Sequence, residues 1–136
     1  AHDGQDPTMT TTPVVLPDLL KLTAAAIAPV ETVLETAKAA VRKLVTDGDR
    51  VSAKLIEANQ AAAHGLSWLA TYVEALRQMQ NWATRLQEDG KFGEVEQLIQ
   101  QIAFGEYLHQ IAGGIHAASM KRVFYEFFSC QFGLFQ

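Results

Sequence analysis

Cysteine and clustered positive charge are nearly missing from this 136-residue sequence. Its single cysteine, Cys130, can form neither an internal disulfide nor a thiolate zinc site, which excludes a secreted disulfide scaffold and predicts a cytoplasmic protein. The 11 Lys and Arg residues are interspersed with 15 Asp and Glu residues, for a formal net charge of −4. No basic cluster is available to neutralise a row of phosphates, so we expect no nucleic-acid partner.

Long apolar runs are missing as well. The longest uncharged stretches, residues 58–73 and 107–120, include Asn, Gln, His and paired glycines. Both are shorter than the roughly twenty apolar residues that span a bilayer, so we expect no contact with a membrane. Residues 1–12 are polar and lack the apolar core of a signal peptide, which predicts a disordered, tag-like N-terminus with Met9 as a natural start.

What the sequence does contain is helix-forming. About half of the residues are hydrophobic, many of them alanine, and glycine and proline are sparse in the central stretches. This composition favours helices that pack closely and supports strands poorly. We therefore predict an all-α fold, with residues 13–115 forming one antiparallel bundle of four or more helices joined by short loops.

The first half of the bundle is interrupted by a proline. Pro17 and Asp18 open a helical pattern, and Pro29 divides it into residues 18–28 and 30–46, either as two pieces or as one kinked helix. Residues 46–49, Thr-Asp-Gly-Asp, end this element. From residue 50 to residue 88 apolar positions keep helical spacing over about ten turns, which predicts one long helix, with Gly65 as a possible break.

The second half begins with the predicted turn at residues 89–93, where Gly90 suits a left-handed residue after a helix end. Residues 94–112 are again helical. One apolar face carries Val95, Leu98, Ile99, Ile102 and Ala103, and a second set extends the apolar surface: Phe104, Tyr107, Leu108 and Ile111. Such a helix is expected to be mostly buried or covered by a partner. Residues 116–136, with five phenylalanines, form an atypical, partly helical segment.

Few residues are candidates for chemistry. Glu106 and His109 form one Glu-x-x-His step, but di-iron bundles need a second such step and further glutamates, so we predict no metal site. His64 is expected to be a structural imidazole bonded to a carbonyl, and Cys130 a buried, inert thiol. The sequence therefore predicts no catalytic, cofactor-binding or metal-binding residue.

The aromatic residues offer two interpretations. Aromatic side chains at helical spacing are most often core residues, because they supply much of the contact area in any core. They also suit a face that docks onto another domain or subunit. The candidate docking residues are Trp68, Tyr72, Trp82, Phe92, Phe104 and Tyr107.

Three runs carry a family resemblance: residues 64–79, beginning His-Gly-Leu-Ser-Trp-Leu, residues 90–99, Gly-Lys-Phe-Gly-Glu-Val-Glu-Gln-Leu-Ile, and residues 104–115, Phe-Gly-Glu-Tyr-Leu-His-Gln-Ile-Ala-Gly-Gly-Ile. With Trp82-Ala83, they resemble the amino-terminal helical extension of methylsuccinyl-CoA dehydrogenases, which are flavin-dependent acyl-CoA dehydrogenases. The resemblance is strong over residues 64–115 and looser over residues 16–60. It is absent from residues 116–136, where His-Ala-Ala-Ser replaces the Pro-Met expected after Gly-Gly-Ile.

The resemblance implies a parent enzyme that oxidises (2S)-methylsuccinyl-CoA to mesaconyl-CoA in the ethylmalonyl-CoA route, with FAD as hydride acceptor and an electron-transfer flavoprotein as oxidant. The flavin domain, acyl-CoA cleft and catalytic glutamate of that family lie downstream of this extension. The chain is then a non-catalytic accessory domain without a cofactor of its own, and its partner is the catalytic body or another subunit. The alternative is a free-standing helical module that forms homo-oligomers through its apolar helices.

Overall fold

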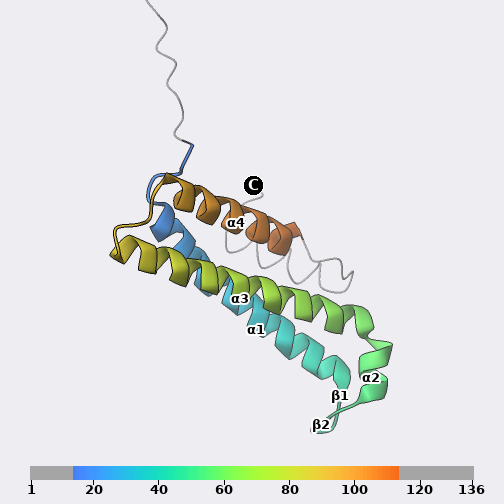
Figure 1. The fold of residues 1–136 in the computed structure, drawn as a ribbon. Coiled ribbons are helices and arrows are strands. Elements are labelled where there is room, and N and C mark those ends of the chain that lie inside the picture. Colours follow the sequence, from blue (N-terminus) through green and yellow to red (C-terminus); the bar gives the residue numbers. More distant parts are fainter. Residues whose placement is uncertain (1–13, 114–136) are drawn as a thin grey trace, which may run out of the picture.

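In the computed structural model the described residues, 14–113, form four helices and one tiny hairpin (Figure 1). The two long helices are α1 (Leu19–Val45) and α3 (Gln60–Glu88), and α4 (Glu94–Gly113) is the third. Between α1 and α3 lie β1 (Thr46–Asp47), β2 (Arg50–Val51) and the short α2 (Ala53–Ala58). The predicted helical bundle is confirmed, with the antiparallel pairing of β1 and β2 as an unpredicted addition.

The helices α1 and α3 run side by side in opposite directions along their length (Figure 1). α4 runs back along α3 and covers only the half of the pair where α1 begins, and α2 and the hairpin lie at the other end. The main core sits where the three helices meet, and its buried members are Val30, Val33, Leu34, Ala37, Leu69, Val73, Leu76, Phe104 and Ile111. A smaller cluster of Val41, Val45 and Ala62 lies beyond the reach of α4.

α1 is one continuous helix that contains Pro29, so of the two predicted alternatives the single helix is observed and the two separate pieces are not. A proline inside a helix costs about 3 kcal/mol or more through its missing donor and a steric clash. Val30, directly after it, is fully buried in the core, and Ile27 before it packs against the same cluster. This packing on both sides of the proline offsets the local cost. Asp18 occupies the N-cap position with a left-handed φ of 56°, and its side chain makes no capping bond.

The predicted long helix over residues 50–88 is divided, and the break lies at Asn59 and not at Gly65. Gly48, with a φ of 59°, allows the tight turn of the hairpin, and Ser52 then caps α2 by accepting a bond from the Leu55 amide at 3.4 Å. The Asn59 side chain donates to the Leu55 carbonyl at 2.9 Å and to the Leu44 carbonyl at 3.4 Å. Side chains that bond the local backbone in this way compete with helix continuation.

The turn before α4 forms as predicted. Gly90 has a φ of 66°, its amide bonds the Gln87 carbonyl, and the Lys91 amide bonds the Leu86 carbonyl at 2.8 Å. This double closure is the Schellman arrangement that ends many helices at a glycine. α4 then begins at Glu94, and the Gln97 backbone amide bonds the Gly93 carbonyl at 3.0 Å.

α4 turns its second apolar set toward the bundle. Phe104 and Ile111 are buried there, together with the polar Gln100. The first apolar face points away from the described bundle, so that Val95, Ile99 and Ile102 are exposed. The sequence predicted a helix that is mostly buried or covered by a partner. Within the described residues only one side of α4 is buried.

A polar trio, in which Thr23 and Gln100 are buried and Gln80 is half-buried, joins the three helices. The Thr23 hydroxyl lies 2.6 Å from Gln80 Oε1, and Gln100 Nε2 lies 3.1 Å from the same oxygen and 3.3 Å from Thr23 Oγ1. Gln100 Oε1 is buried and has no hydrogen-bond partner among the described residues. Thr23, Gln80 and Gln100 thus form a hydrogen-bonded cluster that links α1, α3 and α4 within an otherwise apolar core.

The predictions for residues 1–12 and 116–136, Cys130 included, fall outside the described residues. Within residues 14–113 none of the helices combines the length and apolar character that crossing a bilayer requires.

Candidate functional site

Four of the six predicted docking residues come together where α3 meets α4. The ring centroids of Trp68 and Tyr72 are 5.7 Å apart, and those of Tyr72 and Tyr107 are 5.0 Å apart. His64 adds an edge contact to Trp68 at 6.0 Å. We refer to His64, Trp68, Tyr72 and Tyr107 as the aromatic row. Phe104 lies in the core cluster against which Tyr72 and Tyr107 pack.

Helical spacing explains the row. His64, Trp68 and Tyr72 follow one another at intervals of four residues, which places them on the same side of α3. Tyr107 reaches the row from α4. Aromatic pairs at these centroid separations attract each other beyond their burial, so the row forms one connected surface.

The polar atoms of the row are bonded within the molecule. Trp68 Nε1 donates to His64 Nε2 at 2.7 Å, and the Tyr72 hydroxyl donates to Gln110 Oε1 at 3.0 Å. The prediction of His64 as a buried imidazole bonded to a carbonyl is therefore wrong, because His64 is exposed and its partner is an indole. Trp68 is 44% exposed, so that part of a large apolar ring faces outward with its donor already bonded.

Three of the six predicted docking residues lie outside the aromatic row. Phe104 is 3% exposed and belongs to the core. Trp82 is half-buried further along α3, and Phe92 is half-buried in the turn before α4. The structure therefore separates the six residues into three that belong to a partly exposed row, a core residue beneath it, and two residues elsewhere.

A charged link fastens α1 to α3 on the bundle surface. Arg77 on α3 donates to Glu31 on α1 at 2.7 Å and to Glu74 on its own helix at 2.8 Å. These two bonds raise the pKa of the Arg77 guanidinium. Hydrogen bonds from Gln78 and then from Arg77 lower the pKa of the Glu74 carboxyl below its ordinary 4.5. All of these groups are partly open to solvent, so the link contributes little to stability.

Catalytic groups do not gather in the described part of the chain. Glu106 and His109 are both exposed on α4, and Glu106 accepts a bond from Gln110 at 3.3 Å. Within residues 14–113 no three His, Cys, Asp or Glu side chains lie close enough together to hold a metal ion.

Comparison with known proteins relates the chain to part of an enzyme. Over 101 residues, which are 74% of this chain, the sequence is 58% identical to (2S)-methylsuccinyl-CoA dehydrogenase from Cereibacter sphaeroides. The chain is homologous to a segment of that dehydrogenase. The aligned residues make up 18% of the dehydrogenase's length, so the chain spans less than a fifth of it. No protein-family model matches the chain.

The resemblance read from the sequence is thereby confirmed for a segment of methylsuccinyl-CoA dehydrogenase. Most of the dehydrogenase's length has no counterpart among the aligned residues. In the related dehydrogenase, more than four-fifths of the residues lie outside the aligned segment. Those residues are candidates for a surface that the aromatic row would contact.

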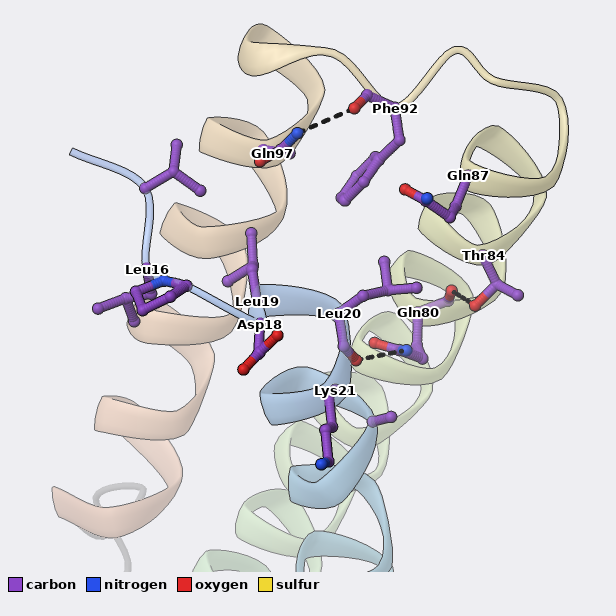
Figure 2. A pocket seen from close by; sticks show the side chains of 13 residues that line it. Leu16, Asp18, Leu19, Leu20, Lys21, Gln80, Thr84, Gln87, Phe92 and Gln97 are labelled. Atoms are coloured by element: carbon purple, nitrogen blue, oxygen red, sulfur yellow. Dashed lines mark hydrogen bonds between the residues drawn. The ribbon is translucent and has the colours of Figure 1, made fainter. Parts of the chain in front are cut away.

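An open groove of about 770 Å³ lies between the start of α1, the end of α3 and the start of α4 (Figure 2). Leu19, Leu20 and Phe92 form its apolar walls, and Gln97 holds the Phe92 carbonyl at 2.9 Å. Its lining residues offer one cation, Lys21, and one carboxylate, Asp18. The remaining polar groups of the lining are uncharged: the side-chain amides of Gln80, Gln87 and Gln97 and the hydroxyl of Thr84.

The segment before α1 closes one side of this groove. Gln101 on α4 accepts a bond from the Leu16 amide at 2.8 Å and donates to the Val14 carbonyl at 2.9 Å. This paired bonding of a side-chain amide to alternate backbone groups fastens the segment to α4. No sequence pattern indicated it, because the contact joins residues 85 and 87 positions apart.

Proposed function

We propose that this chain is a non-catalytic accessory domain of a methylsuccinyl-CoA dehydrogenase-like flavoenzyme, and that the aromatic row packs against the catalytic body or another subunit. The observation that carries the proposal is the 58% identity to a segment of such an enzyme. The helical bundle around a complete apolar core supports a role as a folded packing unit.

The chemistry of the parent enzyme belongs to the rest of its length. FAD there accepts the hydride when an acyl-CoA is dehydrogenated between its α and β carbons. We therefore expect the isolated chain to bind no flavin and to turn over no acyl-CoA.

The aromatic row suits a docking role for two physical reasons. Tryptophan and tyrosine supply large contact areas at low entropic cost and dominate the binding energy of many interfaces. The indole of Trp68 and the hydroxyl of Tyr72 donate to His64 and Gln110. A partner can therefore cover these rings without leaving a donor unbonded.

The first experiment examines the isolated chain. The purified protein is expected to be colourless and to show no flavin absorbance after incubation with FAD. A yellow preparation, or bleaching of a bound flavin by methylsuccinyl-CoA, contradicts the proposal.

The second experiment tests docking. The chain is titrated into Cereibacter sphaeroides methylsuccinyl-CoA dehydrogenase from which the homologous segment has been deleted, and binding is followed by calorimetry. Trp68→Ala is expected to weaken binding by about tenfold or more, as for a hot-spot tryptophan. The matched control Trp82→Ala, outside the row, is expected to leave binding nearly unchanged. Absence of binding, or equal losses for both variants, contradicts the docking role.

A further inference from the structure

The hydrogen bond between Trp68 and His64 can form only with a neutral imidazole. Trp68 Nε1 donates to His64 Nε2 at 2.7 Å, and an indole can only donate. The accepting Nε2 atom therefore carries no proton of its own, and the single ring proton of the neutral imidazole sits on Nδ1. Histidine is the side chain whose charge ordinarily changes between about pH 5 and 8. The bond is therefore lost when His64 gains a second ring proton.

We propose that protonation of His64 regulates the aromatic row, which docks onto its partner when His64 is neutral and releases the partner when His64 is charged. This inference rests on the proposed docking function and adds the regulation of the same surface. An imidazolium carries a proton on both ring nitrogens, so two N–H groups would face each other across the 2.7 Å contact. The two side chains must then separate, and the indole donor of Trp68 turns to water.

The charged form of His64 is costly only when the row is covered. In the free chain both side chains are exposed, so water bonds the released indole donor and solvates the charge. A partner that covers Trp68 excludes this water, which leaves a buried donor without an acceptor and a charge at the edge of the contact. Docking therefore favours the neutral imidazole. By linkage, docking must release a proton wherever His64 of the free chain is partly charged.

The neighbouring helices bring several charges near His64 but no partner for it. α1 and α2 pack against the first turns of α3, and α4 packs further along it (Figure 1). The charged or titratable side chains on the adjoining turns of these helices are Lys38, Arg42 and Lys43 of α1, Lys54 and Glu57 of α2, and Glu106 and His109 of α4. Among residues 14–113 none of these forms a salt bridge or a hydrogen bond with His64. Protonation of His64 is therefore felt first at its bond to Trp68.

NMR of the full chain tests the bond without a partner. The indole proton of Trp68, assigned by comparison with Trp82→Phe, should shift in one transition as the pH falls from about 8 to 5, together with the ring protons of His64. The indole proton of Trp82, outside the row, should stay in place. In His64→Gln the amide oxygen can still accept from Trp68 but takes up no proton, so the transition should vanish. A Trp68 signal that does not respond to pH, or a transition that persists in His64→Gln, overturns the proposal.

Calorimetry measures the effect on docking, with the same deletion variant of Cereibacter sphaeroides methylsuccinyl-CoA dehydrogenase as the partner. Binding should be about tenfold weaker at about pH 5.5 than at about pH 8, as for a buried donor left without an acceptor. His64→Gln should keep most of its affinity on acidification. The matched control His109→Gln removes an exposed histidine of α4 outside the row and should keep the tenfold loss. Between these pH values, buffers of different ionisation enthalpy should detect more proton release for the unchanged chain than for His64→Gln.

The outcomes separate this regulation from the docking role itself. Absence of binding at about pH 8 contradicts the docking role, and the regulation falls with it. Binding at that pH that weakens equally on acidification in the unchanged chain and in His64→Gln contradicts the regulation alone. Loss of the pH effect in His109→Gln would assign it to α4 and also overturn the role of His64. Both histidines are exposed, so the substitutions should leave the fold intact, and circular dichroism at both pH values verifies this.

Discussion

Replacing Leu69 by alanine tests whether the three-helix cluster is the core that holds the bundle together. The Leu69 side chain is 0% exposed and lies in the cluster with Val30 and Ile111. Removing its three outer carbons forfeits about 0.8 kcal/mol each, or roughly 2.4 kcal/mol of transfer free energy. Incomplete collapse of the resulting cavity adds about 1 kcal/mol, so we expect the free energy of unfolding to fall by about 3–4 kcal/mol.

The matched control is Leu22→Ala on α1. Leu22 is 53% exposed, so the same truncation removes little buried surface and leaves no cavity. We expect this variant to lose at most about 1.2 kcal/mol, because about half of the transfer term is already absent and no cavity term is added. The difference between the two variants isolates burial, since the chemical change is the same.

Urea unfolding followed by circular dichroism measures both losses. For a chain of this size a slope of about 1–2 kcal/mol per molar urea converts the Leu69→Ala loss into a midpoint shift of about 1.5–4 M. The protein is kept near 1 µM, where self-association does not contribute. A Leu69→Ala loss below about 1.5 kcal/mol, or a similar loss for Leu22→Ala, would refute the assigned core.

Other positions give sharp expectations. Gly90→Ala should lower the free energy of unfolding by about 1 kcal/mol, because Gly90 has a left-handed φ that alanine adopts only with strain. Gly105→Ala should raise the free energy of unfolding by about 0.5–1 kcal/mol, because Gly105 lies inside α4 with open space for the new methyl group. Thermal melts compare the two variants with the unchanged protein. Because the pKa of Glu74 is lowered in the folded state, its stabilisation is complete above its ordinary 4.5 and is lost as the pH falls through the lowered value. Arg77→Gln should therefore reduce the acid-side decline in urea midpoint only in part, because the Gln78 bond, the larger cause, remains, and a steeper decline would contradict the role of the link. Gln101→Ala should speed hydrogen exchange of the Leu16 amide by about tenfold, because that amide loses its acceptor; NMR measures the rate. Equal rates in the two proteins would show that Gln101 does not bind the segment before α1.

The sequence was sufficient where a single residue determines the local backbone. Gly90 marked the end of α3 because only glycine adopts its left-handed conformation without strain. It was insufficient where tertiary packing decides. Pro29 remained inside α1, where Val30 is buried and Ile27 packs against the same cluster. Asn59 ended α2 through bonds to carbonyls that spacing does not reveal.

The candidate site shows the same limit. The steps of four from His64 to Tyr72 made a row on α3 predictable, but Tyr107 joins it only through the packing of α4. The two apolar faces of α4 are similar in strength, so periodicity alone could not identify the buried one. The fully buried Gln100 made this harder, because a glutamine normally marks the solvent side of a helix.

The hydrogen bonds of Gln100 also fix the orientation of α4 about its own axis. Its amide bonds only where Thr23 of α1 and Gln80 of α3 converge, so turning α4 about its axis would strand a polar group in the core. Ile102 follows two residues later, about 200° further around the helix, which holds it on the opposite side. One buried glutamine thus sets the direction in which the isoleucines face, and a change at Gln100 would be felt first at the outer surface.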